Sequence, residues 1–368
     1  MENPIPELTK LGQSLWYDNI QRRLLTPTPD GSSGELGQMI ARGDIRGVTS
    51  NPSIFHNAIA KSHDYDSALV PLARAGSNAE QIFWELAIQD IKDACDLFQP
   101  LYKEASAGDG YVSLEVSPYL ANDSDGTVAQ AKQLWKTVDR ANLMIKIPAT
   151  KAGIPAIRQV IAAGINVNVT LIFSIDRYVE VMDAYMSGLE DRLLAGGDIE
   201  NIHSVASFFV SRVDNKIDPK LPAGSPLSGK AAIANAKIAY AAFRETFGAP
   251  RFGKLQLGKA NYQRPLWAST STKNPAYPDT LYVDNLIGPA TVNTVPPATL
   301  DAFRDHGKAA LTLMDGVDEC RAQIAALEKL GILMDTVTAE LEAEGVKSFA
   351  DAFTGLLQTI DERRAAAL

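Results

Sequence analysis

Short apolar segments alternate along most of the chain with longer segments of helical periodicity. Eight short segments are predicted to hold strands, at residues 14–18, 45–55 (a strand ending in a loop), 111–117, 143–149, 165–173, 203–210, 264–271 and 290–295. Apolar residues at helical spacing predict the main intervening helices, at 78–105, 126–141, 152–164, 174–196 and 229–248. About eight such units are expected of a closed parallel (β/α)8 barrel, the TIM barrel. A doubly wound sheet is the competing α/β architecture, but it usually has fewer strands.

The pattern becomes entirely helical after about residue 300. No linker precedes this region, so we expect a single domain over residues 1–368, with the barrel at about 12–310 and a C-terminal helical cover at about 311–368. Two stretches rich in Pro, Gly and Ser, at 26–34 and 215–229, are predicted to be surface loops, with a lid over the site as the alternative.

Polar residues occupy alternate positions on several predicted strands, although strands of a parallel barrel are normally apolar on both faces. These positions include Ser113, Glu115, Asn168, Thr170, Ser207, Ser269 and Ser271, and Asp18 and Asn51 stand at or after the ends of the first two strands. Such a face lies either outside, wetted by solvent, or inside at one end of the barrel. Crossover helices would cover the outside, so we expect carboxylates, amides and hydroxyls to converge inside.

A lysine interrupts the apolar segment "LMIKIPATKAG", residues 143–153. Alternation along the strand places Ile145 and Ile147 toward the helices and Lys146 toward the interior of the barrel. Burial disfavours a charged ammonium group, and a neutral amine is the nucleophile that forms a Schiff base with a carbonyl substrate. A structural ion pair and a phosphate contact are the alternatives for Lys146. The nearby Lys151 lies in a polar segment and is expected to be solvated.

Composition excludes several classes of protein. The formal net charge of −9 gives no basic surface for nucleic acid. The two cysteines and four histidines are scattered, which argues against a disulfide framework or a zinc site. No GxGxxG follows a predicted strand, no window approaches a membrane span, and no signal peptide is visible, so we expect a cytoplasmic protein without a dinucleotide cofactor.

Two segments carry a specific family resemblance. "GVTSNPSIF" (47–55) resembles the first transaldolase signature, and "LMIKIPATKAGIPAI" (143–157) resembles the second, which contains a Schiff-base lysine. The resemblance covers roughly residues 12–310. It implies a (β/α)8 barrel that moves a dihydroxyacetone unit between sugar phosphates and needs no cofactor or metal.

The resemblance implies a catalytic role for four residues. Lys146 matches the lysine that attacks the C2 carbonyl of the ketose, and Asp18 matches the acid/base that removes the C4 hydroxyl proton. Glu115 and Thr170 match the pair that holds a water for proton transfer. Besides Lys146, two of the four also have a structural alternative, since Asp18 suits a helix cap and Thr170 suits a strand position.

The remaining matched residues would bind substrate. Asn51 and Asn168 match amides that hydrogen-bond the dihydroxyacetone hydroxyls, although Asn51 before Pro52 also suits a turn. Ser207 and Arg212 in "SFFVSRVD" match a serine and an arginine that bind the sugar phosphate.

The second phosphate-binding position departs from the family pattern. The family has a serine followed closely by an arginine, whereas this chain has Ser269 and then Lys273. Lys273 either supplies the positive charge in place of the arginine or marks a loop that binds differently.

The favoured hypothesis is a transaldolase that converts sedoheptulose 7-phosphate and glyceraldehyde 3-phosphate to erythrose 4-phosphate and fructose 6-phosphate, in the pentose phosphate pathway. The first alternative is a fructose-6-phosphate aldolase, whose family members are shorter and carry glutamine at the position of Glu115. A non-catalytic sugar-phosphate-binding protein is the second. The C-terminal helices are compatible with a homodimer interface or with a monomer.

Overall fold

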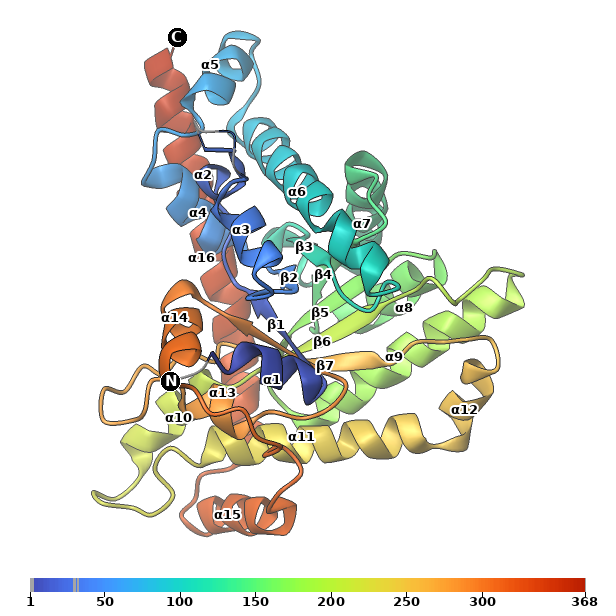
Figure 1. Ribbon diagram of the computed structural model, residues 1–368, viewed down its shortest axis with the longest axis vertical. Coiled ribbons are helices and arrows are strands. Elements are labelled where there is room, and N and C mark those ends of the chain that lie inside the picture. Colours follow the sequence, from blue (N-terminus) through green and yellow to red (C-terminus); the bar gives the residue numbers. More distant parts are fainter. Residues whose placement is uncertain (1–2, 29–30, 32, 368) are drawn as a thin grey trace.

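Eight parallel strands close into a barrel in the computed structural model, which describes residues 3–28, 31 and 33–367 (Figure 1). Each strand pairs with its neighbours in the sequence, and the last pairs with the first. The strands are β1 (Gln13–Tyr17), β2 (Gly47–Val48), β3 (Tyr111–Glu115), β4 (Leu143–Pro148), β5 (Val167–Ile172), β6 (Ser204–Phe209), β7 (Gln263–Ala268) and β8 (Thr291–Val295). The (β/α)8 barrel predicted from the alternating pattern is confirmed.

Helices surround the barrel and continue beyond it. Those up to β8 are α1 (Ile5–Lys10), α2 (Arg22–Leu25), α3 (Glu35–Ala41), α4 (Pro52–Ala60), α5 (Asp66–Arg74), α6 (Ala79–Glu104), η1 (Pro118–Leu120), α7 (Ser124–Val138), α8 (Gly153–Ala162), α9 (Ile175–Leu194), α10 (Ser211–Ile217), η2 (Asp218–Lys220), α11 (Ala231–Gly248), α12 (Pro250–Gln256) and α13 (Leu281–Asn285). After β8 come α14 (Pro297–His306), α15 (Val317–Lys329) and α16 (Met334–Ala367). The additional C-terminal helices are therefore confirmed as well.

Three predicted boundaries were wrong for local reasons. The segment 45–55, predicted as a strand ending in a loop, holds the short β2 and then enters α4, because Asn51 caps this helix and Pro52 begins it. The strand predicted at 264–271 ends at Ala268, since Ser269 has a left-handed backbone with φ of 56°. The loop predicted at 215–229 begins as the end of α10 followed by η2.

The predicted loop at 26–34 falls partly on residues 29, 30 and 32, which lie outside the described residues. Among residues 3–28, 31 and 33–367, none of the helices has the length and apolar composition of a membrane-spanning segment.

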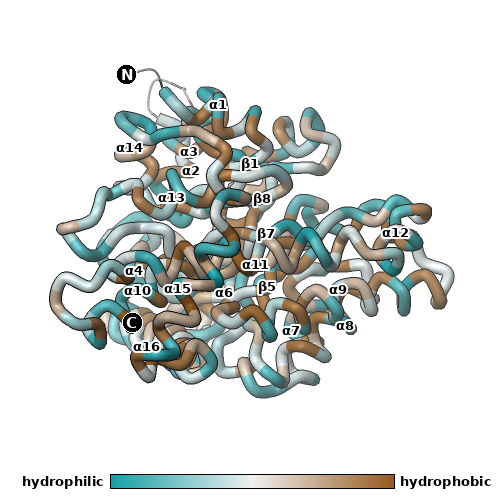
Figure 2. The backbone as a smooth tube through the Cα atoms, turned by 90° about the horizontal axis from the view of Figure 1, so that it is seen from below, coloured by the Kyte–Doolittle hydropathy of each residue, from teal (hydrophilic) through white to brown (hydrophobic). Residues whose placement is uncertain are grey.

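Both faces of the central strands are buried. Every residue of β3, β4 and β5 is buried, including the alternating polar ones. The outward-facing Val167 and Val169 belong to the hydrophobic core beneath the helices. Brown and teal segments alternate along the outer helices in Figure 2, as expected of helices with one face on the barrel. The solvent-wetted alternative for the polar strand positions is therefore wrong.

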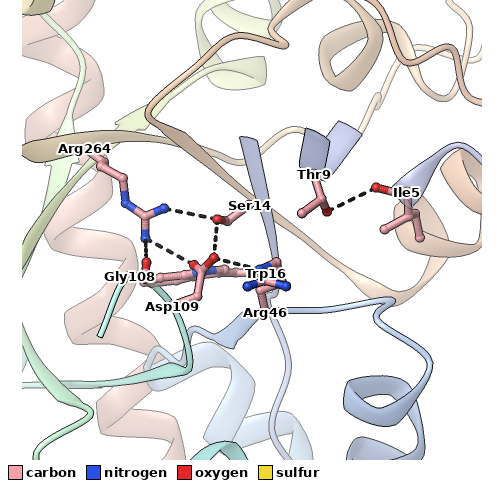
Figure 3. A network of polar contacts seen from close by, with 8 residues as sticks. All are labelled: Ile5, Thr9, Ser14, Trp16, Arg46, Gly108, Asp109 and Arg264. Carbon is pink, nitrogen blue, oxygen red and sulfur yellow. Dashed lines mark hydrogen bonds and ion pairs between the residues drawn. The ribbon is translucent and has the colours of Figure 1, made fainter. Parts of the chain in front are cut away.

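The amino-terminal end of the barrel is closed by a charged network around Asp109 (Figure 3). Arg46 Nε and Ser14 Oγ each donate to Asp109 Oδ2 over 2.7 Å. Trp16 Nε1 and Arg264 Nη2 each donate to Oδ1 over 3.2 Å. The network ties the starts of β1, β2, β3 and β7 to one carboxylate.

Burial alone would raise the pKa of Asp109, but Arg264, Arg46 and the Ser14 hydrogen bond outweigh it, and the pKa is lowered. A lowered folded-state pKa means that the ionised carboxylate stabilises the fold. This contribution is complete above the unfolded-state pKa of about 4 and is lost as the pH falls through the folded-state value.

We predict that Asp109→Asn lowers the free energy of unfolding by about 3 kcal/mol at pH 7, because two partly buried guanidinium groups lose their charge partner. Urea denaturation of both proteins should show the difference shrinking as the pH falls below about 4. Asp318→Asn is the matched control, since that carboxylate is fully exposed, and it should change little. If Asp109→Asn has the wild-type free energy of unfolding at pH 7, or if the loss does not change with pH, the ionised Asp109 does not stabilise the fold.

Candidate active site

A cavity of about 190 Å³ opens at the carboxyl-terminal ends of the barrel strands. In a parallel barrel, this end is where loops and strand ends build active sites. The cavity is lined by Asp18, Thr49, Asn51, Lys146, Thr170, Ser207, Phe209, Arg212, Ala268, Ser269, Ser271, Lys273, Thr294, Pro296 and Phe349. It thus brings together eight of the ten residues singled out in the sequence.

Lys146 extends from β4 into this cavity and is only 4% exposed. Its Nζ donates to the carbonyl oxygen of Ser50 over 3.0 Å. The flanking Ile145 and Ile147 pack into the hydrophobic core, as alternation along the strand predicted. Lys151 is exposed and does not line the cavity.

Glu115 is the closest charged neighbour of Lys146. The parallel register aligns Glu115 of β3 with Lys146 of β4, and Oε2 lies 3.2 Å from Nζ. Apart from this ion pair, Oε2 has no hydrogen-bonding partner among the described residues. Burial raises the pKa of Glu115; the positive charge of Lys146 opposes this shift, and the charge on Asp18 adds to it.

Thr170 supplies a second buried oxygen that is available to a ligand. Its Oγ1 makes no hydrogen bond within the described part of the chain, and its side chain lines the cavity. The register aligns Thr170 with Pro148, two residues beyond Lys146. Glu115 Oε2 and Thr170 Oγ1 therefore offer hydrogen-bonding capacity close to the amine, which suits a water or a substrate hydroxyl.

Asp18 follows β1 and faces the same cavity. Thr49 Oγ1 donates to Asp18 Oδ1 over 2.7 Å and also lies 2.6 Å from Thr294 Oγ1. Burial raises the pKa of Asp18, while the charge of Lys146 and the Thr49 hydrogen bond oppose this rise. No described helix begins next to Asp18, so the alternative of a helix cap is wrong for this residue.

The two predicted asparagines lie in different surroundings. Asn51 lines the cavity, and its Oδ1 accepts from the backbone N–H of Ile54 over 3.0 Å, so it also caps α4. Asn168 is fully buried and is not part of the cavity lining. Its Nδ2 donates to Ser113 Oγ over 3.0 Å, and its Oδ1 accepts from Ser207 Oγ over 2.7 Å.

The predicted phosphate ligands gather on one side of the cavity. Arg212 stands in the first turn of α10, with its guanidinium carbon 5.2 Å from the centre of the Phe209 ring. Burial lowers the pKa of Arg212, and the charge of Glu344 opposes this change. Ser269 Oγ lies 2.9 Å from Ser211 Oγ, and the exposed Lys273 stands at the rim. Two cations and several hydroxyls thus share the wall.

Sequence reasoning missed two residues that shape the site. Thr49 lies within the quoted segment 47–55, and its position next to a strand end was a signal that could have indicated it. Phe349 lies on α16, about 200 positions from Lys146 in the sequence, and its helical periodicity gave no such signal. Only folding brings Phe349 into the cavity.

The described residues contain no group of three or more His, Cys, Asp or Glu side chains placed to hold a metal ion. The polar groups of the cavity are instead two amines, one carboxylate, hydroxyls, an amide and a guanidinium, and Glu115 adds a second carboxylate beside Lys146 from outside the lining. This set suits covalent and acid–base chemistry on a small polar, anionic carbonyl compound.

Known proteins match the chain over nearly its full length. Similar proteins named transaldolase occur in Parafrankia sp., 47% identical over 99% of this chain and 98% of the relative, and in Thermobifida fusca, 47% identical over the whole of both chains. A protein named transaldolase 1 from Streptomyces avermitilis is 48% identical over 98% of this chain and 96% of its own. A family profile described as Transaldolase/Fructose-6-phosphate aldolase matches residues 15–360. The chain therefore belongs to the transaldolase/fructose-6-phosphate aldolase family.

Proposed function

We propose that this protein is a transaldolase that acts through a Schiff base on Lys146. The observation that carries the proposal is the buried amine of Lys146, held 3.2 Å from the Glu115 carboxylate in a cavity shared with Asp18. The names of the similar proteins support transfer rather than simple cleavage. The substrates would be those of the favoured hypothesis, sedoheptulose 7-phosphate and glyceraldehyde 3-phosphate.

The first half of the reaction uses the Lys146–Glu115 pair. Glu115 takes a proton from the ammonium group, and the free amine adds to C2 of the ketose. The C2 oxygen of the carbinolamine then leaves as water, with protons exchanged between Glu115 and a water that Glu115 and Thr170 Oγ1 hold. The raised pKa of Glu115 suits a group that must both accept and return a proton.

Asp18 acts in the second half. It takes the proton of the C4 hydroxyl, and the C3–C4 bond breaks. The aldehyde product then dissociates, and the dihydroxyacetone unit remains on Lys146 as an enamine. Attack of the enamine carbon on the acceptor aldehyde then reverses these steps, with Asp18 returning the proton. Asn51 would hold a dihydroxyacetone hydroxyl directly. Asn168 would act through Ser207, or would replace one of its present hydrogen bonds with a hydrogen bond to the substrate.

Sodium borohydride added with fructose 6-phosphate should reduce the imine and leave a dihydroxyacetone-sized adduct on Lys146, seen by peptide mass spectrometry. Lys146→Met should give no adduct, and Lys151→Met, which alters the exposed lysine outside the cavity, should give the wild-type adduct. An adduct on Lys151, or none in the wild type, would overturn the proposal.

Thr49→Val is expected to move the acid limb of the pH profile of kcat/KM to higher pH. The Thr49 hydrogen bond lowers the pKa of Asp18, so its loss raises that pKa, and the basic carboxylate is populated only at higher pH. The shift should be about one pH unit, because a hydrogen bond to a charged group is worth roughly 1.5 kcal/mol. Thr294→Val, which leaves the Thr49–Asp18 bond in place, is the control. An acid limb that is unchanged in Thr49→Val would remove this role.

Arg212→Ala should raise KM for fructose 6-phosphate by about a hundredfold and Lys273→Ala by about tenfold, since charge-assisted hydrogen bonds to a phosphate are lost. The smaller value for Lys273 reflects its exposed position at the rim. Turnover of unphosphorylated fructose should change little in either variant, and Lys151→Ala should behave as the wild type. An unaltered KM in Lys273→Ala would show that the loop binds in another way.

A further inference from the structure

Helix α16 crosses the carboxyl-terminal end of the barrel and is fixed there along its length (Figure 1). It contacts α4, α5, α6 and α10, together with β5. Ion pairs join it to the barrel helices: Lys216 with Glu340 (2.9 Å) and with Glu344, Arg177 with Glu342 (3.6 Å), and Arg363 with Asp66 (3.4 Å). Charges at both ends of α16 thus restrain its position over the site.

Three residues spaced four apart on α16 define the face that meets the barrel. At Gly345 the helix approaches β5 so closely that a Cβ atom would lie 2.9 Å from Leu171 Cδ2. Phe353 packs against the rings of Phe83 (5.2 Å between centroids) and Tyr119 (5.3 Å). Between these two anchors, Phe349 projects into the cavity.

Phe349 covers the amine that the proposed mechanism uses. Its ring centre lies 5.7 Å from Lys146 Nζ, and the side chain is 5% exposed. Among the described residues that line the cavity, Phe349 alone comes from a helix after β8; the others lie on strands, in the segments that follow them or, for Arg212, in the first turn of α10. The chain therefore places an apolar ring, from a separate helix, next to the nitrogen that carries the intermediate.

We infer that Phe349 favours transfer over release of dihydroxyacetone by keeping bulk water away from the enamine on Lys146. The dihydroxyacetone unit then stays bound until an acceptor aldehyde enters the site. This inference rests on the proposed function. A closed, apolar cover is one way in which active sites prevent side reactions of reactive intermediates. Phe349 does not take part in bond making; it controls which reaction partner reaches the enamine.

The enamine has two fates, which differ in what bonds to its C3 carbon. In transfer, C3 forms a bond to the acceptor aldehyde carbon, whose oxygen takes the proton held by Asp18. In release, C3 takes that proton instead, directly or through water, and a water oxygen then adds to C2. The C2–Nζ bond breaks, and free dihydroxyacetone leaves the regenerated amine. Water near Lys146 thus favours release over transfer.

The test is the ratio of dihydroxyacetone release, measured with fructose 6-phosphate alone, to transfer, measured with erythrose 4-phosphate as acceptor. Phe349→Ala should raise this ratio by about tenfold or more, because removal of the ring admits water beside Lys146. Should the alanine variant not fold, Phe349→Val carries the same test, since valine is too short to reach the amine.

Phe353→Ala is the matched control, because it loosens the same helix through an aromatic residue that does not line the cavity. Its ratio should equal that of the wild type, even if both rates fall. An unchanged ratio in the folded Phe349 variant, or an equal rise in Phe353→Ala, would overturn the inference. Borohydride trapping on wild-type Lys146 tests the proposed function separately, so the two failures are distinguishable.

Discussion

The burial of one amine beside one carboxylate is the constraint on which the site depends. Lys146 and Glu115 come from neighbouring strands and meet only because the parallel register of a closed barrel aligns them. An unpaired charge at this depth would be costly, and the pair with Glu115 and the Ser50 carbonyl reduces that cost. The same pairing gives the amine a nearby proton acceptor. The Glu115 carboxylate therefore both stabilises the buried charge and serves the proposed chemistry.

The two ends of the barrel have different roles: the amino-terminal end contributes to stability, and the carboxyl-terminal end holds the groups of the proposed chemistry. At the amino-terminal end, Asp109 has its hydrogen-bonding capacity satisfied by two arginines, Ser14 and Trp16. At the other end, Thr170 Oγ1 lacks a hydrogen-bonding partner among the residues described, and Glu115 Oε2 is held only by its ion pair with Lys146. Buried polar groups left in this state are typical of sites prepared for a ligand.

The sequence predicted the barrel and most of the cavity, because both depend on local alternation. A period of two is enough to place Lys146, Thr170 and Ser207 inside a closed sheet. It does not reveal that Asn168 is held beneath the cavity by Ser113 and Ser207, since that depends on packing between strands. Phe349 could not be predicted from the sequence for the same reason, because its place next to Lys146 is set by how α16 docks on distant helices.

The most direct test of the central claim observes the carbon–nitrogen bond without reduction. Enzyme labelled with ¹⁵N at the lysine Nζ would be mixed with fructose 6-phosphate carrying ¹³C at C2 and studied by ¹³C NMR. A Schiff base on Lys146 predicts a C2 resonance split by coupling to nitrogen, which disappears in Lys146→Met. Bound substrate whose C2 shows only carbonyl or hemiketal resonances, with no coupling to nitrogen, would contradict it.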